Sequence, residues 1–494
     1  MWLFDGIAPL PANDARIEDL TLDSREVRAG SLFFALSGGQ SHGLKFIAEA
    51  AARGATVVLW EPSSEAPAVA PAILKSMFVA PVAGLRQLLG RIADRFFGWP
   101  STHLRIVGVT GTNGKTTVAY LLTQCLERLQ RDAAYMGTIG WGRIGALAAP
   151  THTTSDVLSV HRQLAKLRAS GVRDVAMEVS SHALDQGRVD GVRFHSAAFT
   201  NLTRDHLDYH PSMQAYGAAK ARLFEFADLQ HLVINIGDPF GRELALKLGG
   251  RVPLTAVWVG AGDVRWLADR SLCADDIALD LRGMTMELAG SFGKCRVTTK
   301  LLGRFNAENS LIVLACLMAL GVSLADAAAA LAGCVAPPGR MEVIESASSG
   351  KPLAVVDYAH TPDALAKALS ALREHCRGAL WCVFGCGGDR DPGKRPLMGA
   401  IADELADNII VTDDNPRSEK PQSITRAIAS AITRHSPRVI HDRGEAIATA
   451  LGEAVSDDMV LIAGKGHEDY QIYGDTRRAF SDRNEALRCL RAVA

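Results

Sequence analysis

The chain has 494 residues, of which 48% are hydrophobic and 22% charged, and its formal net charge is −1. This length exceeds that of one ordinary hydrophobic core, so we expect two to four domains. A charge near zero argues against a dedicated binder of nucleic acid or anionic membranes, and no run approaches the ~18 apolar residues that predict a membrane span.

Residues 1–100 predict a small α/β domain. A helix-like stretch over 45–53 leads into an apolar run over 54–60, which is typical of a buried strand. Residues 61–72 are rich in proline, alanine and serine and predict a loop, and breaker residues over 97–101 end the domain. The first residues lack the basic and apolar segments of a secretion signal, and the nine scattered cysteines show neither zinc spacing nor a disulfide framework. We therefore expect a cytoplasmic protein with reduced thiols.

A glycine-rich segment follows the apolar run at 104–107. Residues 108–117 read Gly-Val-Thr-Gly-Thr-Asn-Gly-Lys-Thr-Thr, which predicts a strand, a tight turn and a helix that begins near Thr116. In such a turn backbone N–H groups surround phosphate oxygens, Lys115 reaches the outer phosphates, and the Thr116 hydroxyl can hold Mg²⁺. The strict template would have glycine where Val109 stands, so this is a variant loop. The alternative is a glycine-rich turn with an incidental lysine, but the order of strand, turn and Gly-Lys-Thr-Thr favours use of a nucleoside triphosphate.

Two further α/β blocks follow, over 101–336 and 337–494, and Pro337-Pro338-Gly339 marks the boundary between them. Short apolar runs alternate with helix-length segments, which predicts parallel sheets covered by helices on both faces. In the central block we expect a mostly β segment over 251–300, a helix over 325–332 and strands over 174–177, 196–200 and 232–235. In the last block we expect strands, each followed by a helix, over 354–357, 380–385, 408–412 and 459–463.

Polar residues cluster after several of these strands, where parallel sheets place their ligand sites. They are Thr153-Thr154-Ser155-Asp156, Glu178 at the end of an apolar strand, the run Asn-Leu-Thr-Arg-Asp-His-Leu-Asp-Tyr-His at 201–210, and Lys220. Taken singly, a helix cap, a solvated loop and a surface lysine would explain them as well.

Together with later segments, these motifs form an ordered series over nearly the whole chain. The series is the glycine-rich loop, Met-Glu-Val-Ser-Ser-His at 177–182, the polar run at 201–210, Tyr-Gly-Ala-Ala-Lys at 216–220, Gly-Arg-Phe-Asn-Ala-Glu-Asn at 303–309, Pro-Gly-Arg-Met-Glu at 338–342 and Asp-Tyr-Ala-His-Thr-Pro at 357–362. It resembles the Mur ligase family, whose members couple ATP cleavage to amide-bond formation on cell-wall precursors. The resemblance implies a small N-terminal α/β domain that binds the uridine diphosphate, a central P-loop ATPase domain with a mostly parallel sheet, and a Rossmann-like doubly wound C-terminal domain that binds an amino acid.

The segment Asp414-Asn415-Pro416-Arg417 indicates the substrate within that family. The resemblance assigns Asp-Asn-Pro-Arg to recognition of meso-diaminopimelate, added to the D-glutamyl γ-carboxylate of UDP-N-acetylmuramoyl-L-alanyl-D-glutamate through an acyl phosphate. Arg417 suits a two-pronged bond to a carboxylate, Arg390 could hold a second one, and Glu468 offers an acceptor for an ammonium. Gly464 completes this set. Read alone, Asp-Asn-Pro-Arg is a plain turn.

The resemblance implies the remaining roles residue by residue, with Mg²⁺ as cofactor and ATP as co-substrate. Lys115, Lys220, His206 and Glu178 would be catalytic, and Thr116, Glu178, His206 and a carbamylated Lys220 would hold the metal. ATP would contact Gly111, Thr112, Asn113, Gly114, Lys115, Thr116, Thr117, Asn309, Arg340, Asp357 and His360. The nucleotide-sugar dipeptide would contact Leu22, Ser24, Gln40, Ser41, Thr153, Thr154, Ser180, Gln186 and Arg188. Gly39 and His42 depart from the family pattern, which weakens the assignment of Gln40 and Ser41.

Three alternatives stay open at this point. A lysine-adding Mur ligase would share most of these motifs, and a folylpolyglutamate synthetase-like ligase would share the loop but not Asp-Asn-Pro-Arg. A nucleotide-dependent switch would need a guanine-reading segment such as Asn-Lys-x-Asp, and the sequence has none. We expect small-molecule substrates, no nucleic-acid partner and a monomer.

Overall fold

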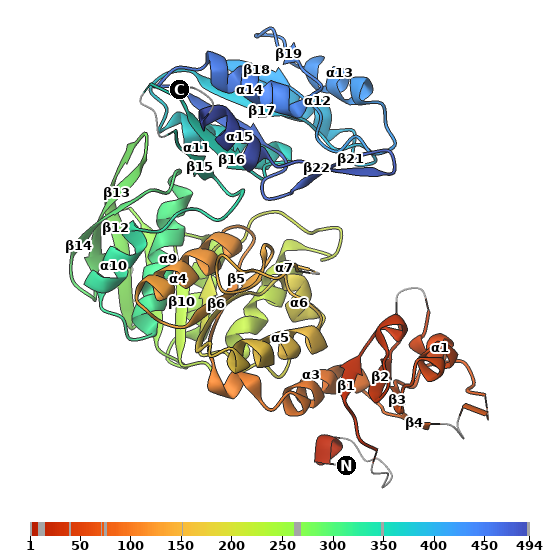
Figure 1. Cartoon of the computed structure of the whole chain (residues 1–494). Helices are drawn as coiled ribbons and strands as arrows, with labels where there is room; N and C mark the ends of the chain where they lie inside the picture. Colours follow the sequence, from red (N-terminus) through yellow and green to blue (C-terminus); the bar gives the residue numbers. More distant parts are fainter. Residues whose placement is uncertain are drawn as a thin grey trace. The chain divides into compact units, whose positions relative to one another are not determined.

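A computed structural model describes residues 2–7, 15–38, 41–70, 72–73, 77–150, 152–260, 268–346 and 350–491 (Figure 1). Two compact units are distinguished, and each is described by itself. The first comprises Met1–Lys115, Gln130–Leu232 and Gly250–Val252, and the second comprises Thr116–Leu129, Val233–Gly249 and Pro253–Ala494. Within the described ranges, no helix has both the length and the apolar character that crossing a bilayer requires.

The first unit begins with a four-stranded parallel sheet in the order β1-β2-β3-β4. Successive residues of its strands face two separate hydrophobic cores, one on each side of the sheet. Leu32, Phe34 and Leu59 pack with α3, whereas Phe33 and Val58 face α1. The elements are η1 (Trp2–Phe4), β1 (Asp19–Thr21), η2 (Ser24–Glu26), β2 (Ser31–Ala35), η3 (Gly43–Phe46), α1 (Ile47–Ala52), β3 (Val57–Trp60), β4 (Phe78–Pro81), α3 (Leu85–Phe96) and η4 (Pro100–His103).

The predicted helix over 45–53 is therefore divided into the 3-10 turn η3 and the helix α1. The His42 side chain caps η3 by accepting from the Leu44 amide at 3.1 Å. The predicted strand over 54–60 starts later, at Val57, because Gly54 has a φ of +94° and ends the helical stretch.

The first unit also contains five strands in the order β9-β5-β8-β6-β7. Strands β5, β6, β8 and β9 run parallel, and β7 is antiparallel to β6. The predicted strands after the glycine-rich loop are confirmed. The elements are β5 (Arg105–Thr110), β6 (Ala133–Gly137), β7 (Gly140–Gly142), α5 (Val157–Ala169), β8 (Asp174–Glu178), α6 (Ser181–Asp185), β9 (Ser196–Phe199), α7 (Met213–Ala221), η5 (Arg222–Glu225) and the start of β10 (His231–Asn235).

The second unit holds the rest of the central block and the last block. Strands β12, β13 and β14 form an antiparallel meander beside β11, which confirms the mostly β prediction for the described part of 251–300. The elements are α4 (Lys115–Arg128), α8 (Pro239–Leu248), β11 (Leu254–Val259), β12 (Arg270–Asp280), β13 (Gly283–Gly290), β14 (Cys295–Thr299), α9 (Phe305–Ala319) and α10 (Leu324–Ala332).

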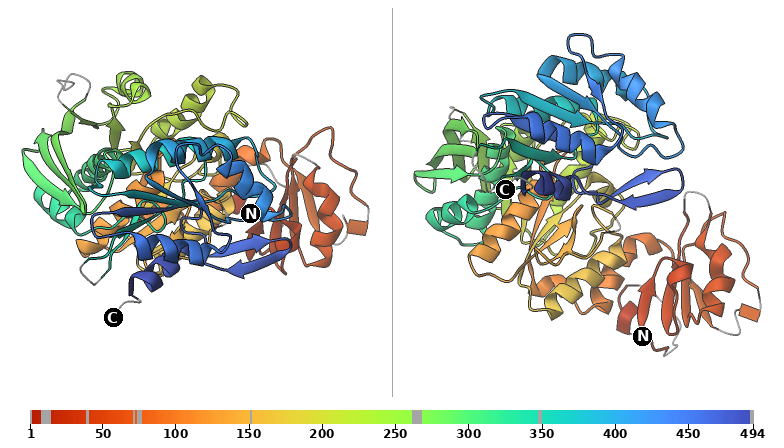
Figure 2. Two further views of the ribbon diagram at one scale, coloured as in Figure 1. Left: turned by 90° about the horizontal axis from the view of Figure 1, so that it is seen from above. Right: turned by 45° about the horizontal axis from the view of Figure 1, so that its top comes forward.

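The last block is a doubly wound sheet in the order β15-β16-β20-β17-β18-β19, parallel except for β15. Figure 2 shows this block from two further sides, coloured teal to dark blue. Alternate strand residues face opposite ways: Val355 and Cys382 pack with α11–α13, and Val356 and Val383 pack with α14 and α15. The elements are β15 (Glu342–Ile344), β16 (Leu353–Asp357), α11 (Pro362–Arg373), β17 (Leu380–Phe384), α12 (Lys394–Leu405), β18 (Asn408–Val411), α13 (Pro421–Ala429), β19 (Arg438–Val439), α14 (Arg443–Glu453), β20 (Met459–Ala463), β21 (Tyr470–Tyr473), β22 (Thr476–Ala479) and α15 (Asp482–Arg491).

One prediction for this block is wrong. A helix was expected directly after the strand at 459–463, but the β21–β22 hairpin comes first and α15 follows it. Tyr473 pairs with Thr476 across a two-residue loop whose Gly474 has a φ of +56°, the geometry that tight hairpins favour. The α/β class with mostly parallel sheets is confirmed, and the domain boundaries near residues 100 and 336 stay predictions.

A close backbone contact in the first unit gives a stability test. Gly90 lies on α3, and a side chain there would clash with the carbonyl oxygen of Asp190. We expect Gly90→Ala to lower the free energy of unfolding by about 1–3 kcal/mol, because backbone atoms cannot rotate away. Gly452 on α14 is the control, since no atom lies within 4 Å of an added Cβ and alanine favours a helix by about 0.5 kcal/mol. Thermal unfolding should show a lower Tm for Gly90→Ala and an unchanged or higher one for Gly452→Ala. Equal shifts would contradict this account.

Candidate active site

The glycine-rich loop lies between β5 and α4 and is tied to the polar run that follows β9. The Thr112 amide donates to the Asn201 carbonyl at 2.8 Å, and the Asn113 amide donates to Asn201 Oδ1 at 2.9 Å. The Thr112 hydroxyl donates to the Thr203 carbonyl at 3.2 Å and accepts from the Thr203 amide at 3.0 Å. Gly111 has a φ of +150°, and a side chain on it would clash with the Thr200 hydroxyl. The loop is thus held open by its partners, as a phosphate cradle requires.

Two lysine ammonium groups meet at this loop. Lys115 Nζ donates to the carbonyls of Gly111 and Thr112 at 2.8 and 2.9 Å, and Lys220 Nζ, from α7, donates to the same Gly111 carbonyl at 2.7 Å. The sequence predicted both residues as catalytic, and the structure brings them together. Two cations on one carbonyl form a site for anions.

The environment of Lys220 disfavours its charged form. The side chain is 1% exposed, and its Nζ stands 4.2 Å from the centre of the Tyr216 ring. Burial, and next the positive charge of Lys115, hold the pKa of Lys220 well below its ordinary value. A neutral amine is a nucleophile, so this lysine is suited to modification.

The ring of His206 lies edge-on to that of Tyr216. The two ring centres are 6.0 Å apart, and the His206 ring also meets the His182 ring edge-on at 4.8 Å. His206 has a φ of +52°, a left-handed conformation that strains a side-chain-bearing residue and is frequent at functional sites. Its neighbour Asp205 bonds the His206 amide at 2.8 Å.

Glu178 ends β8 and is 1% exposed. Its Oε1 accepts from the Tyr135 hydroxyl and from the Thr138 amide at 2.9 Å, and its Oε2 accepts from the Thr138 hydroxyl at 3.2 Å. Gly137 leaves room for this carboxylate, because a Cβ there would clash with it. Tyr135 and Thr138 were not predicted from sequence, where nothing separates Tyr135 from the apolar strand around it.

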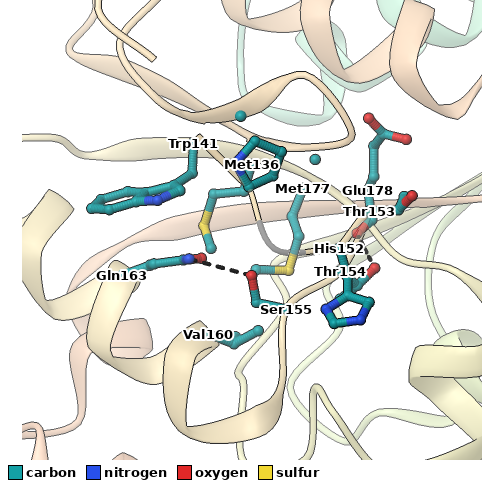
Figure 3. A pocket seen from close by; sticks show the side chains of 13 residues that line it. Met136, Trp141, His152, Thr153, Thr154, Ser155, Val160, Gln163, Met177 and Glu178 are labelled. Carbon is teal, nitrogen blue, oxygen red and sulfur yellow. Dashed lines mark hydrogen bonds between the residues drawn. The ribbon is translucent and has the colours of Figure 1, made fainter. Parts of the chain in front are cut away.

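Predicted substrate residues line one pocket next to Glu178 (Figure 3). Thr153 accepts from the Thr138 hydroxyl at 3.2 Å, and the Thr154 hydroxyl donates to the Glu178 carbonyl at 3.0 Å. Ser180 is the N-cap of α6. The pocket is also lined by Ser155, from the same polar run, and by Met136, Trp141, His152 and Gln163, which were not predicted.

Arg188 extends the same group. It donates to the Thr154 carbonyl at 2.9 Å and, through Nε and Nη2, to Gln186 Oε1 at 2.9 and 2.6 Å. Burial lowers the pKa of Arg188, and the main opposing charge is that of Asp156. A half-buried guanidinium that bonds neutral groups suits an anionic ligand.

The described uridine residues lie next to the N-terminal sheet of the first unit, with Leu22 just after β1, Ser24 at the start of η2 and Ser41 shortly before η3. The Ser24 hydroxyl donates to Glu49 at 2.8 Å, and Leu22 packs at the edge of a core. The Ser41 carbonyl closes a turn by accepting from Gly38, while Gln40 and Gly39 fall outside the described residues. His42 is a buried cap residue, which gives it a structural role.

In the second unit, three of the predicted nucleotide residues converge near the start of the last block. Asp357 accepts from the amides of Met341 and Ala359 at 2.8 and 2.9 Å, and burial raises its pKa against the opposing charge of Arg340. Arg340 stacks on Tyr358 at 4.9 Å, and the Tyr358 and His360 rings are 4.6 Å apart. The predicted Asn309 lies elsewhere, buried on α9, where it donates to Asn306 at 2.8 Å.

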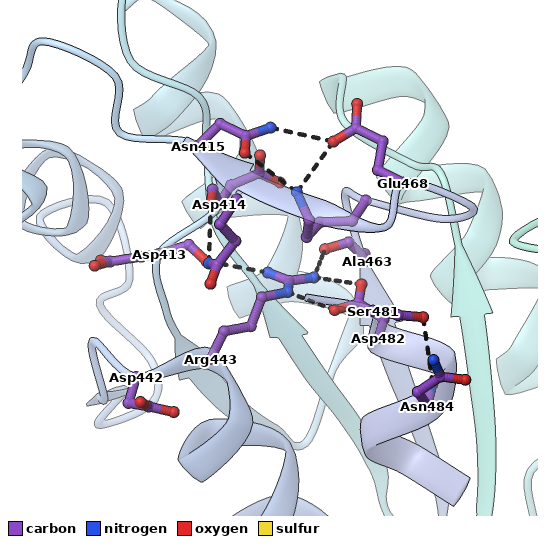
Figure 4. A network of polar contacts seen from close by, with 12 residues as sticks. Asp413, Asp414, Asn415, Asp442, Arg443, Ala463, Glu468, Ser481, Asp482 and Asn484 are labelled. Atoms are coloured by element: carbon purple, nitrogen blue, oxygen red, sulfur yellow. Dashed lines mark hydrogen bonds and ion pairs between the residues drawn. The ribbon is translucent and has the colours of Figure 1, made fainter. Parts of the chain in front are cut away.

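The segment after β18 forms a polar cluster with the segment after β20 (Figure 4). Asn415 Nδ2 donates to Glu468 Oε2 at 3.1 Å, and Lys465 Nζ donates to that same oxygen at 3.0 Å and to Asn415 Oδ1 at 3.3 Å. Lys465 is fully buried. Asp414 Oδ2 would lie 2.7 Å from a Cβ on Gly464, so the glycine admits the carboxylate. The predicted amino-acid residues Asp414, Asn415, Gly464 and Glu468 are thus neighbours.

Arg417 and Arg390 share the adjoining loop. Arg417 Nη1 donates to the Gly388 carbonyl at 2.7 Å, and Arg417 has a φ of +51°. The Gly388 amide donates to the Asn415 carbonyl at 2.9 Å, which joins the loop after β17 to the loop after β18. A Cβ on Gly387 would lie 2.9 Å from Arg417 and 3.8 Å from Arg390, so the two arginines flank one glycine. Two arginines thus lie at the loop that adjoins the acidic cluster, and such a mixture of charges fits a zwitterion.

Several supporting residues were missed at the sequence level. Tyr216 is the first residue of the motif Tyr-Gly-Ala-Ala-Lys, and Lys465 directly follows the predicted Gly464, so position in the sequence was a usable signal for both. Gln471 and Tyr473 reach back from β21 to the carbonyl and carboxylate of Asp413, at 3.3 and 3.1 Å, and no sequence signal connects them. Among the residues that the structure describes, no three His, Cys, Asp or Glu side chains lie close enough together to form a metal site.

Comparison with known proteins gives matches over most of the chain. Residues 16–97 match the model described as "Mur ligase family, catalytic domain", residues 109–317 match the "Mur ligase middle domain", and residues 339–466 match the "Mur ligase, glutamate ligase domain". A protein of Ectopseudomonas mendocina is 47% identical over 98% of this chain and 97% of its own length. A protein of Pseudomonas aeruginosa is 46% identical over 98% and 97%. Both are named UDP-N-acetylmuramoyl-L-alanyl-D-glutamate–2,6-diaminopimelate ligase.

Solved structures agree with the sequence matches. A structure of a ligase with that same name is 36% identical, covers 98% of this chain and 96% of its own, and has a TM-score of 0.72. A folylpolyglutamate synthase of Mycobacterium tuberculosis, solved with ADP and AMPPCP, is 18% identical with a TM-score of 0.59 over 76% of this chain, and shows a shared fold.

The support of Glu178 can be tested by removing one hydroxyl. We expect Tyr135→Phe to lower the free energy of unfolding by about 1.5–3 kcal/mol, because a buried carboxylate loses a charge-assisted hydrogen bond. Tyr209→Phe is the control, since its hydroxyl bonds Asp185 at 2.8 Å on an exposed face. Denaturant unfolding of both variants measures the difference. A Tyr135→Phe effect no larger than that of the control would mean that the phenol does not hold Glu178.

Proposed function

This chain belongs to the Mur ligase family, and we propose that it joins meso-2,6-diaminopimelate to the D-glutamyl γ-carboxylate of UDP-N-acetylmuramoyl-L-alanyl-D-glutamate, with cleavage of ATP to ADP and phosphate. The observation that carries the proposal is the cluster after β18 and β20, where Asp414, Asn415 and Glu468 lie together beside two arginines. Ammonium groups suit its carboxylates, and carboxylates suit its guanidinium groups.

The reaction proceeds in two steps, formation of an acyl phosphate and its aminolysis. An oxygen of the γ-carboxylate attacks the γ-phosphorus of ATP, the bond from that phosphorus to the β,γ-bridging oxygen breaks, and ADP leaves. The amine nitrogen of diaminopimelate then attacks the acyl carbon, and the tetrahedral intermediate loses a proton and expels phosphate. Activation is necessary because a carboxylate is a poor acylating agent at neutral pH.

The protein brings two anions together by means of cations. Lys115, at the end of the glycine-rich loop, neutralises the γ-phosphate as charge develops on it. Arg188 and the hydroxyls of Thr153 and Thr154 orient the dipeptide end of the nucleotide sugar. Arg417 and Arg390 hold carboxylates of the amino acid, and Glu468 accepts from its ammonium group. In the second unit Arg340, Asp357 and His360 would contact the nucleotide.

In the first unit, the buried Glu178 would supply carboxylate oxygens of the kind that Mg²⁺ prefers, with His206 as a further ligand. In the second unit, Thr116 at the start of α4 would supply a hydroxyl oxygen. When bound, Mg²⁺ would neutralise phosphate charge. Lys220 could join this set only as an anion, because an ammonium cannot ligate a cation.

Carbamylation would convert Lys220 into such an anion. The neutral amine attacks carbon dioxide, an N–C bond forms, and a proton is released, which leaves a carbamate. The low pKa of Lys220, caused first by burial and then by Lys115, keeps the amine neutral at lower pH than an ordinary lysine. The carbamate would also relieve the repulsion between the two cations at Gly111. The monomeric state and the cytoplasmic location stay predictions.

The proposed reaction is tested by phosphate release with ATP, Mg²⁺ and the nucleotide-sugar dipeptide. We expect release that depends on meso-diaminopimelate and is weak with L-lysine or without amino acid. Equal or faster release with L-lysine would keep the ligase chemistry and reject the interpretation of Asp414–Arg417. A folate substrate in place of the nucleotide sugar tests the folylpolyglutamate synthetase-like alternative.

Two variants should separate nucleotide chemistry from amino-acid binding. Lys115→Ala should abolish turnover at any amino-acid concentration, because the γ-phosphate loses its cation. Arg417→Ala should raise the KM for diaminopimelate by roughly 10–100-fold with kcat largely kept, because a charge-assisted bond of about 1.5–3 kcal/mol is lost. Steady-state kinetics with each substrate varied in turn gives both values. An Arg417→Ala enzyme with a normal KM for diaminopimelate would remove this residue from the site.

The carbamate is tested by carbon-13 NMR after incubation with labelled bicarbonate. We expect a protein-bound carbamate signal in the wild type and its loss in Lys220→Met. Lys465→Met is the matched control, because Lys465 is also buried but pairs with Glu468 at 3.0 Å. The signal should persist in Lys465→Met. In the wild type it should decrease as the pH falls, because the carbamate decomposes when the amine is protonated. A signal that survives Lys220→Met would assign the carbamate to another residue.

A further inference from the structure

A fully buried ion pair lies directly behind the amino-acid cluster (Figure 4). Arg443, the first residue of α14, donates from Nε to Asp482 Oδ1 at 2.6 Å and from Nη2 to Asp482 Oδ2 at 2.8 Å. Both side chains are 0% exposed. Asp482 is the first residue of α15, where a helix N-terminus favours a carboxylate. The pair therefore joins the beginnings of two helices on one face of the sheet.

The same guanidinium also holds the two segments that carry the predicted amino-acid residues. Nη2 donates to the Ala463 carbonyl at 3.0 Å, and Nη1 lies 3.4 Å from the Asp413 carbonyl. Ala463 immediately precedes Gly464, and Asp413 immediately precedes Asp414. One planar group thus fixes the point at which both recognition segments leave their strands.

Stability alone is a weak reason for such a pair. Burying two charges carries a desolvation penalty, and well-packed apolar residues in their place are often neutral or stabilising. The guanidinium does something that apolar residues cannot do, since it donates to a carboxylate and to two carbonyls at fixed angles. Its charge also reaches the cluster: the pKa of Arg443 is raised, against the effect of burial, by Asp482 first and then by Asp414 and Glu468.

We propose that Arg443, held by Asp482, is a positioning residue for amino-acid recognition, which sets the separation between Asp414 and the Gly464–Glu468 segment. Arg443 itself is fully buried and would act through the backbone of the two segments. The inference rests on the proposed function for the identity of the amino acid, but the contacts between Arg443 and the two segments do not depend on that function.

The test is a double variant, Arg443→Met with Asp482→Leu, compared with Arg443→Met alone. The single variant leaves Asp482 buried without its cation and is expected to be destabilised. The double variant removes both charges and should regain much of the lost Tm. We expect its KM for diaminopimelate to rise roughly tenfold, because two hydrogen bonds to the recognition segments are lost, whereas its KM for ATP should change less than about twofold. A structural role alone predicts that both KM values return to normal with the Tm.

The control is an exposed ion pair that joins β19 to the end of the same helix, α14. Arg438 and Glu453, at 2.6 Å, are replaced together by glutamine, which should leave all KM values unchanged. Arg443→Lys covers the case in which the double variant does not fold. A lysine keeps the charge for Asp482 but cannot donate to both carbonyls in a planar fork, so the KM for diaminopimelate should still rise.

Two results would overturn the inference: a folded double variant with a normal KM for the amino acid, or a folded Arg443→Lys variant with one. Failure of the proposed function looks different. The wild-type chain would then use another amino acid, and the ratio of KM values for that amino acid would still test Arg443.

Discussion

The proposed chemistry depends on one backbone carbonyl that two lysine side chains share. Lys115 and Lys220 both donate to the Gly111 carbonyl, and the Lys220 ammonium also lies over the face of the Tyr216 ring. Such an arrangement is unfavourable unless an anion is bound or one lysine is neutral. Phosphate at Lys115 and a carbamate at Lys220 would satisfy both conditions. The glycine-rich loop, the polar run at 201–203 and α7 are all needed to bring these groups together.

The amino-acid cluster, unlike the phosphate loop, gathers carboxylates. Asp413, Asp414 and Glu468 are acidic and largely buried, and the cations Arg443 and Lys465 lie among them. Lys465 occupies one oxygen of Glu468, and Arg390 and Arg417 lie at the adjoining loop. A ligand that carries both ammonium and carboxylate groups matches this alternation of charge. L-lysine has one carboxylate where diaminopimelate has two, so it would leave one of the two arginines without an anion.

The parts that the sequence predicted are those with a local signal. Apolar runs predicted strands β5, β8, β9, β10, β16, β17, β18 and β20 but not β6, β7, β15 or β19. A fixed spacing of glycines and lysine predicted the phosphate loop. Ordered motifs placed Glu178, His206, Lys220 and Asn415 at the carboxyl ends of strands or just beyond them. The β21–β22 hairpin was missed because β22, Thr476–Ala479, is mostly polar and exposed throughout, so no apolar run marks a strand ahead of the expected helix. Arg443 and Asp482 are 39 residues apart, and Tyr135 and Glu178 are 43 apart, so no periodicity connects either pair. The low pKa of Lys220 depends on tertiary burial, which no motif encodes.

The most direct test follows oxygen atoms and the amino acid in one reaction. The nucleotide-sugar dipeptide would carry oxygen-18 in both oxygens of its γ-carboxylate, and equal amounts of meso-diaminopimelate and L-lysine would compete for it in the presence of ATP. The account predicts a product whose mass corresponds to addition of diaminopimelate, and phosphate that carries one oxygen-18 from the acyl phosphate. A lysine product, or phosphate without the label, would contradict it.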